Sequence, residues 1–139
     1  MITRKNIEIA MRDGLILRAD LYLPGEGTNY PSILVRTPYD KTEFASKPRY
    51  TAPELYVEAG YAVLVQDCRG TGASEGQYQP WLMDAEDGYD TVEWMAEREW
   101  CSGKIGMMGS SNLGATQLLT ASMRPPHLTC ICPAGTSAG

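Results

Sequence analysis

The 139-residue sequence has only one histidine, and no apolar run is long enough for a signal peptide or a membrane span. Its formal net charge of −5 argues against a basic surface that would bind nucleic acid or anionic lipid. With 43% apolar and 21% charged residues, the composition is ordinary for a globular domain. We therefore expect a cytoplasmic protein that binds neither nucleic acid nor membrane.

The four cysteines form no C-x-x-C pair, and the sequence has neither a G-K-[ST] nor a G-x-G-x-x-G phosphate-binding loop. Cys130 and Cys132 lie two residues apart in the apolar segment LTCICP, so on a strand they would share a face. That spacing could suit a metal pair, but we favour small apolar core residues. We expect no metal, no cofactor and no disulfide framework.

Hydrophobic periodicity predicts an α/β fold. Residues 6–25 alternate apolar and polar side chains about Asp13-Gly14, which predicts a β-hairpin. Strands and helices then alternate, with strands expected at 32–39, 61–70, 104–109 and 127–133 and helices at 51–60, 84–100 and 111–123. This order predicts a mostly parallel sheet with an N-terminal antiparallel hairpin and helices on both faces. Without a linker or repeat, residues 1–139 are expected to belong to one domain.

The segment IGMMGSSNLG (105–114) places two serines between a predicted strand and a predicted helix. A nucleophilic serine needs a sharp turn of this kind, which strains its backbone and requires small neighbours. Gly109 and Gly114 give that spacing around Ser111 rather than Ser110, and the helix N-terminus would favour a developing oxyanion. Because Leu113 stands where G-x-S-x-G has its second glycine, a glycine turn for packing alone remains an alternative.

Three motifs occur in the order RTPYDK (36–41), QDCRGTGASEG (66–76) and WCSGKIGMMGSSNLGATQ (100–117). Together they resemble the cocaine esterase and Xaa-Pro dipeptidyl-peptidase-like family, which includes the α-amino acid ester hydrolases. The resemblance extends over essentially the whole chain. It implies the N-terminal portion of an α/β-hydrolase fold. It also implies a serine hydrolase that cleaves small-molecule esters or peptides, Xaa-Pro bonds among them, through an acyl-enzyme.

The resemblance also implies roles for three residues. Ser111 matches the family's nucleophile, and Tyr39 matches the tyrosine whose hydroxyl is one oxyanion donor. The second donor would be the backbone N–H of Asn112, which stands where the family has a tyrosine; the amide donor is unaffected by this difference. A phenol can donate a hydrogen bond to a developing alkoxide. Without the resemblance, we would interpret Tyr39 as a turn residue beside Pro38.

Two groups of charged or polar residues leave alternatives open. The loop after the strand at 61–70 could contact substrate or form an internal brace, and we favour the brace for Asp67, Arg69, Ser74 and Glu75. The acidic residues of the helix at 84–100 could form a metal or amine site. We favour a solvated helix face for that set, which comprises Asp84, Glu86, Asp87, Asp90 and Glu93.

The sequence offers no well-placed residue for the catalytic base. In α/β-hydrolases the order along the chain is serine, carboxylate, histidine. His127 follows Ser111 by only sixteen residues and begins the last predicted strand, at the opposite edge of the sheet. We therefore expect the N-terminal part of a hydrolase, truncated after the sixth predicted strand and inactive by itself.

That last strand would leave a bare apolar edge, open to the missing C-terminal part or to self-association. One alternative function is a non-enzymatic α/β module that binds a partner through this edge. Another is an enzyme that takes its histidine and aspartate from a second chain.

Overall fold

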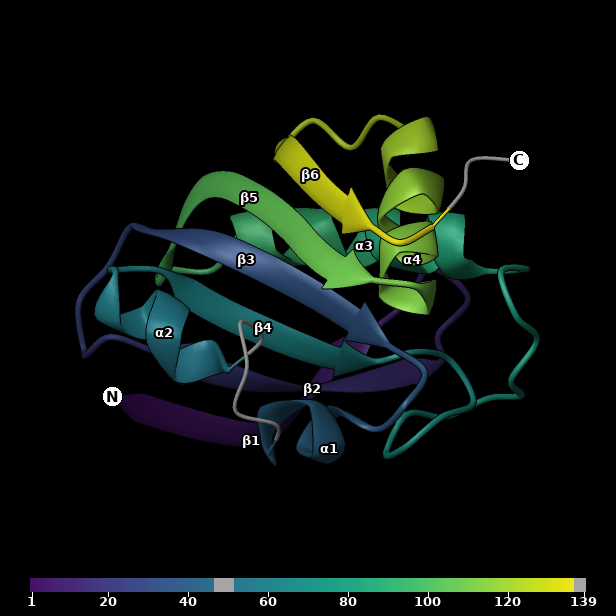
Figure 1. The fold of residues 1–139 in the computed structure, drawn as a ribbon, viewed down its shortest axis with the longest axis horizontal. Helices are drawn as coiled ribbons and strands as arrows, with labels where there is room; N and C mark the ends of the chain where they lie inside the picture. The colour runs from purple at the N-terminus through teal and green to yellow at the C-terminus, as the bar shows by residue number, and fades with distance from the viewer. Residues whose placement is uncertain (47–51, 137–139) are drawn as a thin grey trace.

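A six-stranded sheet forms the centre of the computed structural model, which describes residues 1–46 and 52–136 (Figure 1). Its spatial order is β1-β2-β4-β3-β5-β6. The pairs β1–β2 and β2–β4 are antiparallel, whereas β3–β4, β3–β5 and β5–β6 are parallel. The predicted α/β class and N-terminal hairpin are thus confirmed. The strands are β1 (Ile2–Ala10), β2 (Ile16–Leu23), β3 (Tyr30–Thr37), β4 (Ala62–Asp67), β5 (Cys101–Ser110) and β6 (Leu128–Ala134).

Helices cover both faces of the sheet, α1 and α2 on one side and α3 and α4 on the other (Figure 1). Three of them match predicted helices; α1 was not expected, and Thr51 of the helix predicted at 51–60 lies outside the described residues. Gly60 follows α2 with a φ of 98°, as a helix C-terminus predicts. The helices are α1 (Lys41–Ser46), α2 (Pro53–Glu58), α3 (Asp84–Ala96) and α4 (Asn112–Ser122).

The two central strands are buried on both faces, which explains their continuous apolar sequences. Successive side chains on a strand point to opposite faces. Leu34 and Leu64 accordingly join the core that includes Met95 of α3, whereas Val35 and Val65 join the core beneath α1 and α2. Burial of these neighbouring strands fixes the register of β3 against β4.

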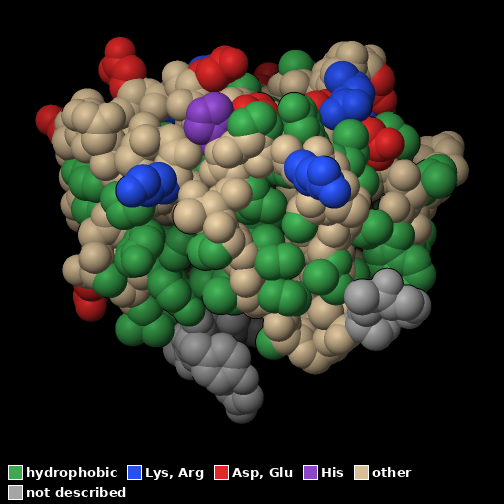
Figure 2. Space-filling view, turned by 90° about the horizontal axis from the view of Figure 1, so that it is seen from above, with side chains coloured by type: hydrophobic (Ala, Val, Ile, Leu, Met, Phe, Trp, Pro, Cys, Tyr) green, Lys and Arg blue, Asp and Glu red, His purple; other side chains and the backbone are tan. Residues whose placement is uncertain are grey.

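Strand β6 forms the last strand of the sheet in the described part of the chain. Cys130 and Cys132 are exposed on it, so the expected core position is wrong. The reason is that no described element covers them at the edge. Figure 2 looks onto this side of the molecule, where many hydrophobic side chains gather. A hollow of about 470 Å³ next to β6 is lined partly by Tyr61, Met108 and the two cysteines. Within residues 1–46 and 52–136, no helix is long and apolar enough to cross a membrane.

Candidate active site

The carboxyl ends of β3, β4 and β5 meet at one edge of the sheet, where their arrowheads lie together in Figure 1. Thr37 pairs with Asp67 at the ends of β3 and β4. The β3–β5 register, continued three residues beyond the pair of Leu34 with Met107, brings Thr37 level with Ser110. The segments that follow these strands therefore leave from one place, which is where α/β proteins bind ligands.

Ser111 connects β5 directly to α4, at the predicted strand-to-helix turn. Its φ of 57° and ψ of −120° lie in a region that non-glycine residues rarely adopt. The Ser111 N–H donates to the Ala134 carbonyl at 2.8 Å, and the Ser111 carbonyl accepts from the N–H groups of Gly114 and Ala115. Backbone contacts hold the strained turn, while the serine side chain is exposed.

The glycines on either side of Ser111 are required by close contacts. Gly109 has a φ of 136°, and a Cβ there would overlap the Leu113 side chain. At Gly114 a Cβ would lie 2.7 Å from Cγ2 of Thr136. These contacts explain the small neighbours that the turn was expected to need, because β5, α4 and the segment after β6 approach one another there.

Gln117 ties the turn to the edge strand, a link that the sequence did not predict. Its Nε2 donates to the Gly109 carbonyl at 3.0 Å, and its Oε1 accepts from the Cys132 N–H at 2.8 Å. The side chain is fully buried, so both hydrogen bonds are shielded from water. Gln117 thereby holds the end of β5 beside β6.

Tyr39, Ser111 and Asn112 line one hollow of about 510 Å³, together with Trp81, Ala115, Gly135 and Thr136. Tyr39 and Ser111 also border a second hollow of about 250 Å³. Asn112 is the first residue of α4, where an N–H group has no acceptor within the helix. The structure thus brings together the three residues to which the family resemblance assigns the nucleophile and the oxyanion donors.

The segment that carries Tyr39 is anchored by Lys41, a buried residue that sequence reasoning missed. The Lys41 N–H donates to Oδ1 of Asp67 at 2.8 Å. Its ammonium donates to Oδ1 of Asn6 at 2.8 Å and lies 3.2 Å from Oδ1 of Asp20. Burial raises the pKa of Asp67, even though that carboxylate also accepts from the Ala73 N–H. Only the tertiary fold brings these distant residues together.

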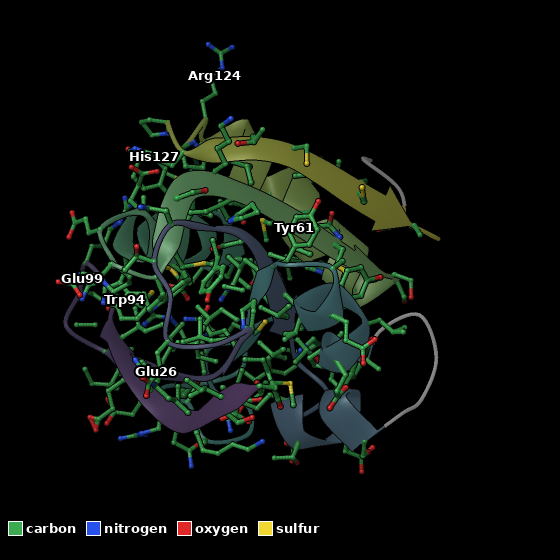
Figure 3. The ribbon with its side chains drawn as sticks, turned by 90° about the vertical axis from the view of Figure 1, so that its left-hand side faces the viewer. Glu26, Tyr61, Trp94, Glu99, Arg124 and His127 are labelled. Carbon is green, nitrogen blue, oxygen red and sulfur yellow. The ribbon has the colours of Figure 1, made fainter. Side chains whose placement is uncertain are left out.

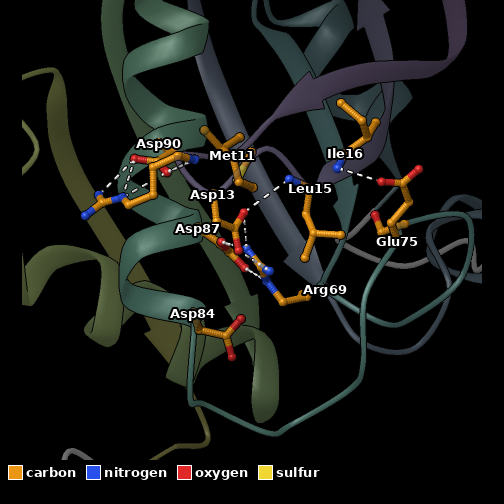
Figure 4. Close-up of polar contacts among 12 residues, drawn as sticks. Met11, Asp13, Leu15, Ile16, Arg69, Glu75, Asp84, Asp87 and Asp90 are labelled. Atoms are coloured by element: carbon orange, nitrogen blue, oxygen red, sulfur yellow. Dashed lines mark hydrogen bonds and ion pairs between the residues drawn. The ribbon is translucent and has the colours of Figure 1, made fainter.

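The loop after β4 is braced by Arg69 (Figure 4). The guanidinium lies 2.7 Å from Oδ2 of Asp13 in the hairpin turn and 2.8 Å from Oδ1 of Asp87 in α3. These hydrogen bonds raise the pKa of Arg69 and lower the pKa of Asp13. In the same loop, the Ser74 hydroxyl donates to the Asp67 carbonyl, and Glu75 accepts from the Ile16 N–H. The predicted brace is confirmed.

The acidic residues of α3 are not one solvated face. Asp84 and Asp87 are buried, so the prediction is wrong for both. Arg36 lies 3.0 Å from Asp84, and Arg69 pairs with Asp87, which compensates the two buried charges. Asp90 pairs with Arg12. Among the described residues, no group of three or more acidic, histidine or cysteine side chains could hold a metal ion.

His127 lies at the opposite edge of the sheet from Ser111, as predicted. Figure 3 looks onto the starts of the parallel strands, and His127 lies there beside the start of β6. Its Nδ1 is 2.8 Å from Oε1 of Glu93, and its carbonyl accepts from the Ile105 N–H. Ile105 is six residues before Ser111, so along β5 the separation is about 20 Å. His127 is therefore too far away to deprotonate Ser111.

Comparison with known proteins shows several related hydrolases. The model of the X-Pro dipeptidyl-peptidase (S15) family matches residues 13–138. The chain is 43% identical to cocaine esterase from Rhodococcus sp. (strain MB1 Bresler) over 134 residues, which are 96% of this chain and 23% of that protein.

Two solved structures share the fold. A CocE/NonD family hydrolase from Staphylococcus aureus has a TM-score of 0.85 at 31% identity, over 94% of this chain and 27% of that one. An α-amino acid ester hydrolase has a TM-score of 0.83 at 31% identity, over 94% of this chain and 24% of that one. The chain spans about a quarter of the length of these relatives.

Proposed function

The chain belongs to the X-Pro dipeptidyl-peptidase (S15) family, and from this premise we propose that it carries the nucleophile of a serine hydrolase. Its fold is the N-terminal part of an α/β hydrolase. The observation that carries the proposal is the exposed Ser111, held with a φ of 57° between β5 and α4 and bordering a hollow with Tyr39 and Asn112. Substrates would be small esters or amides, Xaa-Pro peptides among them.

In the proposed reaction, the Ser111 hydroxyl oxygen attacks the carbonyl carbon of the substrate. The carbonyl oxygen becomes an oxyanion between the Tyr39 hydroxyl and the Asn112 N–H. One such donor changes the rate about a hundred- to a thousandfold. When the tetrahedral intermediate collapses, the alcohol or amine leaves with a proton and the acyl group stays on Ser111. Water then attacks the acyl-enzyme, which releases the acid and regenerates the serine.

The proton of Ser111 needs a base, and we propose that the base and its carboxylate come from residues outside these 139. The one histidine, His127, is hydrogen-bonded to Glu93 and lies about 20 Å from Ser111 along β5. The relatives are about four times as long, which leaves room for the other catalytic residues. We also place the protein in the cytoplasm, where its four free cysteines would stay reduced.

Esterase activity of the purified chain tests the proposal that the catalytic base lies outside these 139 residues. We expect hydrolysis of p-nitrophenyl acetate near background, because loss of the histidine from a serine protease lowers turnover about a millionfold. Ser111→Ala and His127→Ala should both match the parent chain. An ordinary enzymatic rate that His127→Ala abolishes would contradict the proposal and make His127 the base.

The exposed β6 edge favours a second candidate function, a module that binds a partner without catalysis. Cys130 and Cys132 are exposed there, and the neighbouring hollow of about 470 Å³ has mainly apolar walls. An exposed strand edge can pair with another chain. If this function holds for copies of the same chain, light scattering should detect a dimer, and Cys132→Arg should give a monomer. A monomeric parent chain would count against self-association.

A further inference from the structure

The loop between β4 and α3 presents an unusual tryptophan. Trp81 is 57% exposed, whereas Trp94 and Trp100 pack with their ring centroids 6.4 Å apart. The backbone of Trp81 has a φ of 68°, a value that bulky residues rarely adopt. Strained residues of this kind cluster at ligand-binding sites. Core packing therefore explains neither the exposure of the Trp81 ring nor its strained backbone.

Trp81 borders the same hollow as Ser111. The other residues around this space of about 510 Å³ include the small Ala115 and Gly135, which leave room opposite a large ring. None of the residues that line the hollow carries a charge. Trp81 is more than half exposed, and within the described residues no hydrogen bond joins its indole to another residue, so the ring is open to a ligand. A neutral, flat group fits this environment best.

We propose that Trp81 determines substrate specificity, by packing against a flat, uncharged ring of the ester or amide that reacts at Ser111. This inference rests on the proposed function, because it places the ring next to that serine. Indole and aromatic rings attract each other in offset or edge-to-face arrangements. A saturated ring of similar size buries similar area but lacks that attraction. The site should therefore prefer aromatic to alicyclic substrates.

Binding of two matched esters to the chain tests the inference by NMR. Methyl benzoate has a flat ring, and methyl cyclohexanecarboxylate has a puckered ring of the same number of carbon atoms. Trp81→Phe assigns the Trp81 indole signal. We expect methyl benzoate to shift that signal together with the backbone amides of Ser111 and Asn112. Trp81→Ala removes the packing area for both esters but the ring–ring attraction for methyl benzoate alone. It should therefore weaken methyl benzoate binding about threefold to tenfold more than binding of the cyclohexane ester.

Two further variants serve as controls. Trp81→Phe keeps a flat ring and should retain the preference for methyl benzoate. Tyr78→Ala removes another exposed aromatic side chain of the same loop, which does not border the hollow, and should bind like the parent.

Two negative results would have different consequences for the inference and for the proposed function. If both esters shift the Ser111 and Asn112 amides but Trp81→Ala keeps the aromatic preference, the inference is wrong and the proposed function stands. If neither ester shifts those amides, the inference and the oxyanion assignment both fail.

Discussion

Replacement of Ser111 by glycine should make the chain more stable while it removes the proposed nucleophile. A non-glycine residue with a φ of 57° and a ψ of −120° is strained, and such strain costs about 1–3 kcal/mol. Glycine adopts this conformation without that cost, but it gains about 0.5–1 kcal/mol of conformational freedom in the unfolded chain. The midpoints of these two ranges give a net gain in unfolding free energy of about 1.2 kcal/mol.

The matched control is Ser111→Ala, which removes the same hydroxyl but keeps the Cβ atom and therefore the strain. Because the Ser111 side chain is exposed, this control should lie within about 0.5 kcal/mol of the parent chain. The unfolding entropy of a chain of this length is about 0.29 kcal/mol/K. Ser111→Gly should therefore melt about 4 °C above Ser111→Ala.

Thermal unfolding followed by circular dichroism, with urea unfolding at 25 °C as a second measure, gives the comparison. The difference between the two variants isolates the backbone term. A glycine variant no more stable than the alanine variant would refute the conclusion that the turn is strained.

Three other perturbations follow from the ion pairs and cysteines. Arg69→Gln leaves Asp87 buried without its partner and should cost about 3 kcal/mol in urea unfolding; an unchanged midpoint would contradict the brace. The Asp13 pKa lies below its ordinary 3.8, so its stabilisation is present above that value and is lost as the pH falls through the lowered pKa. Asp13→Asn should thus be less stable than the parent at neutral pH, and the difference in melting temperature should close in acid. Burial raises the pKa of Cys68 to about 12, so iodoacetamide should modify only the two exposed cysteines of native protein, counted by mass, and all four after denaturation.

Local patterns were sufficient to predict the sheet and the turn at Ser111. The alternation about Asp13-Gly14 and the continuous apolar segments depend on neighbours in the sequence, and they became β1–β2 and the central strands. The spacing of Gly109 and Gly114 likewise reflects close approach within one turn. The roles of Ser111, Tyr39 and Asn112 remain predictions, because they follow from family resemblance.

The distant partners of charged residues could not be predicted, although a brace that includes Arg69 was. Lys41 meets Asp20 and Arg69 meets Asp87 only after the strands and helices have packed. The same packing buries acidic residues on a helix whose sequence alone indicates a solvated face. Cys130 is exposed for a related reason, since an apolar strand sequence does not reveal whether another element covers it. Trp81 lies in a loop without periodicity, so no sequence pattern indicated that it borders the same hollow as Ser111.

The most direct test is labelling of Ser111 by a fluorophosphonate. The chain would be compared with a protein in which it replaces the matched N-terminal segment of the Rhodococcus cocaine esterase. In this joined protein, the rest of the esterase would supply the proposed base and carboxylate. We expect rapid labelling of Ser111 in the joined protein, identified by peptide mass, and at most very slow labelling of the chain alone. Ser110→Ala should leave the labelling unchanged, and Ser111→Ala should abolish it. A joined protein that is folded but unlabelled at Ser111, or labelled at Ser110 instead, would contradict the assignment of Ser111 as the nucleophile.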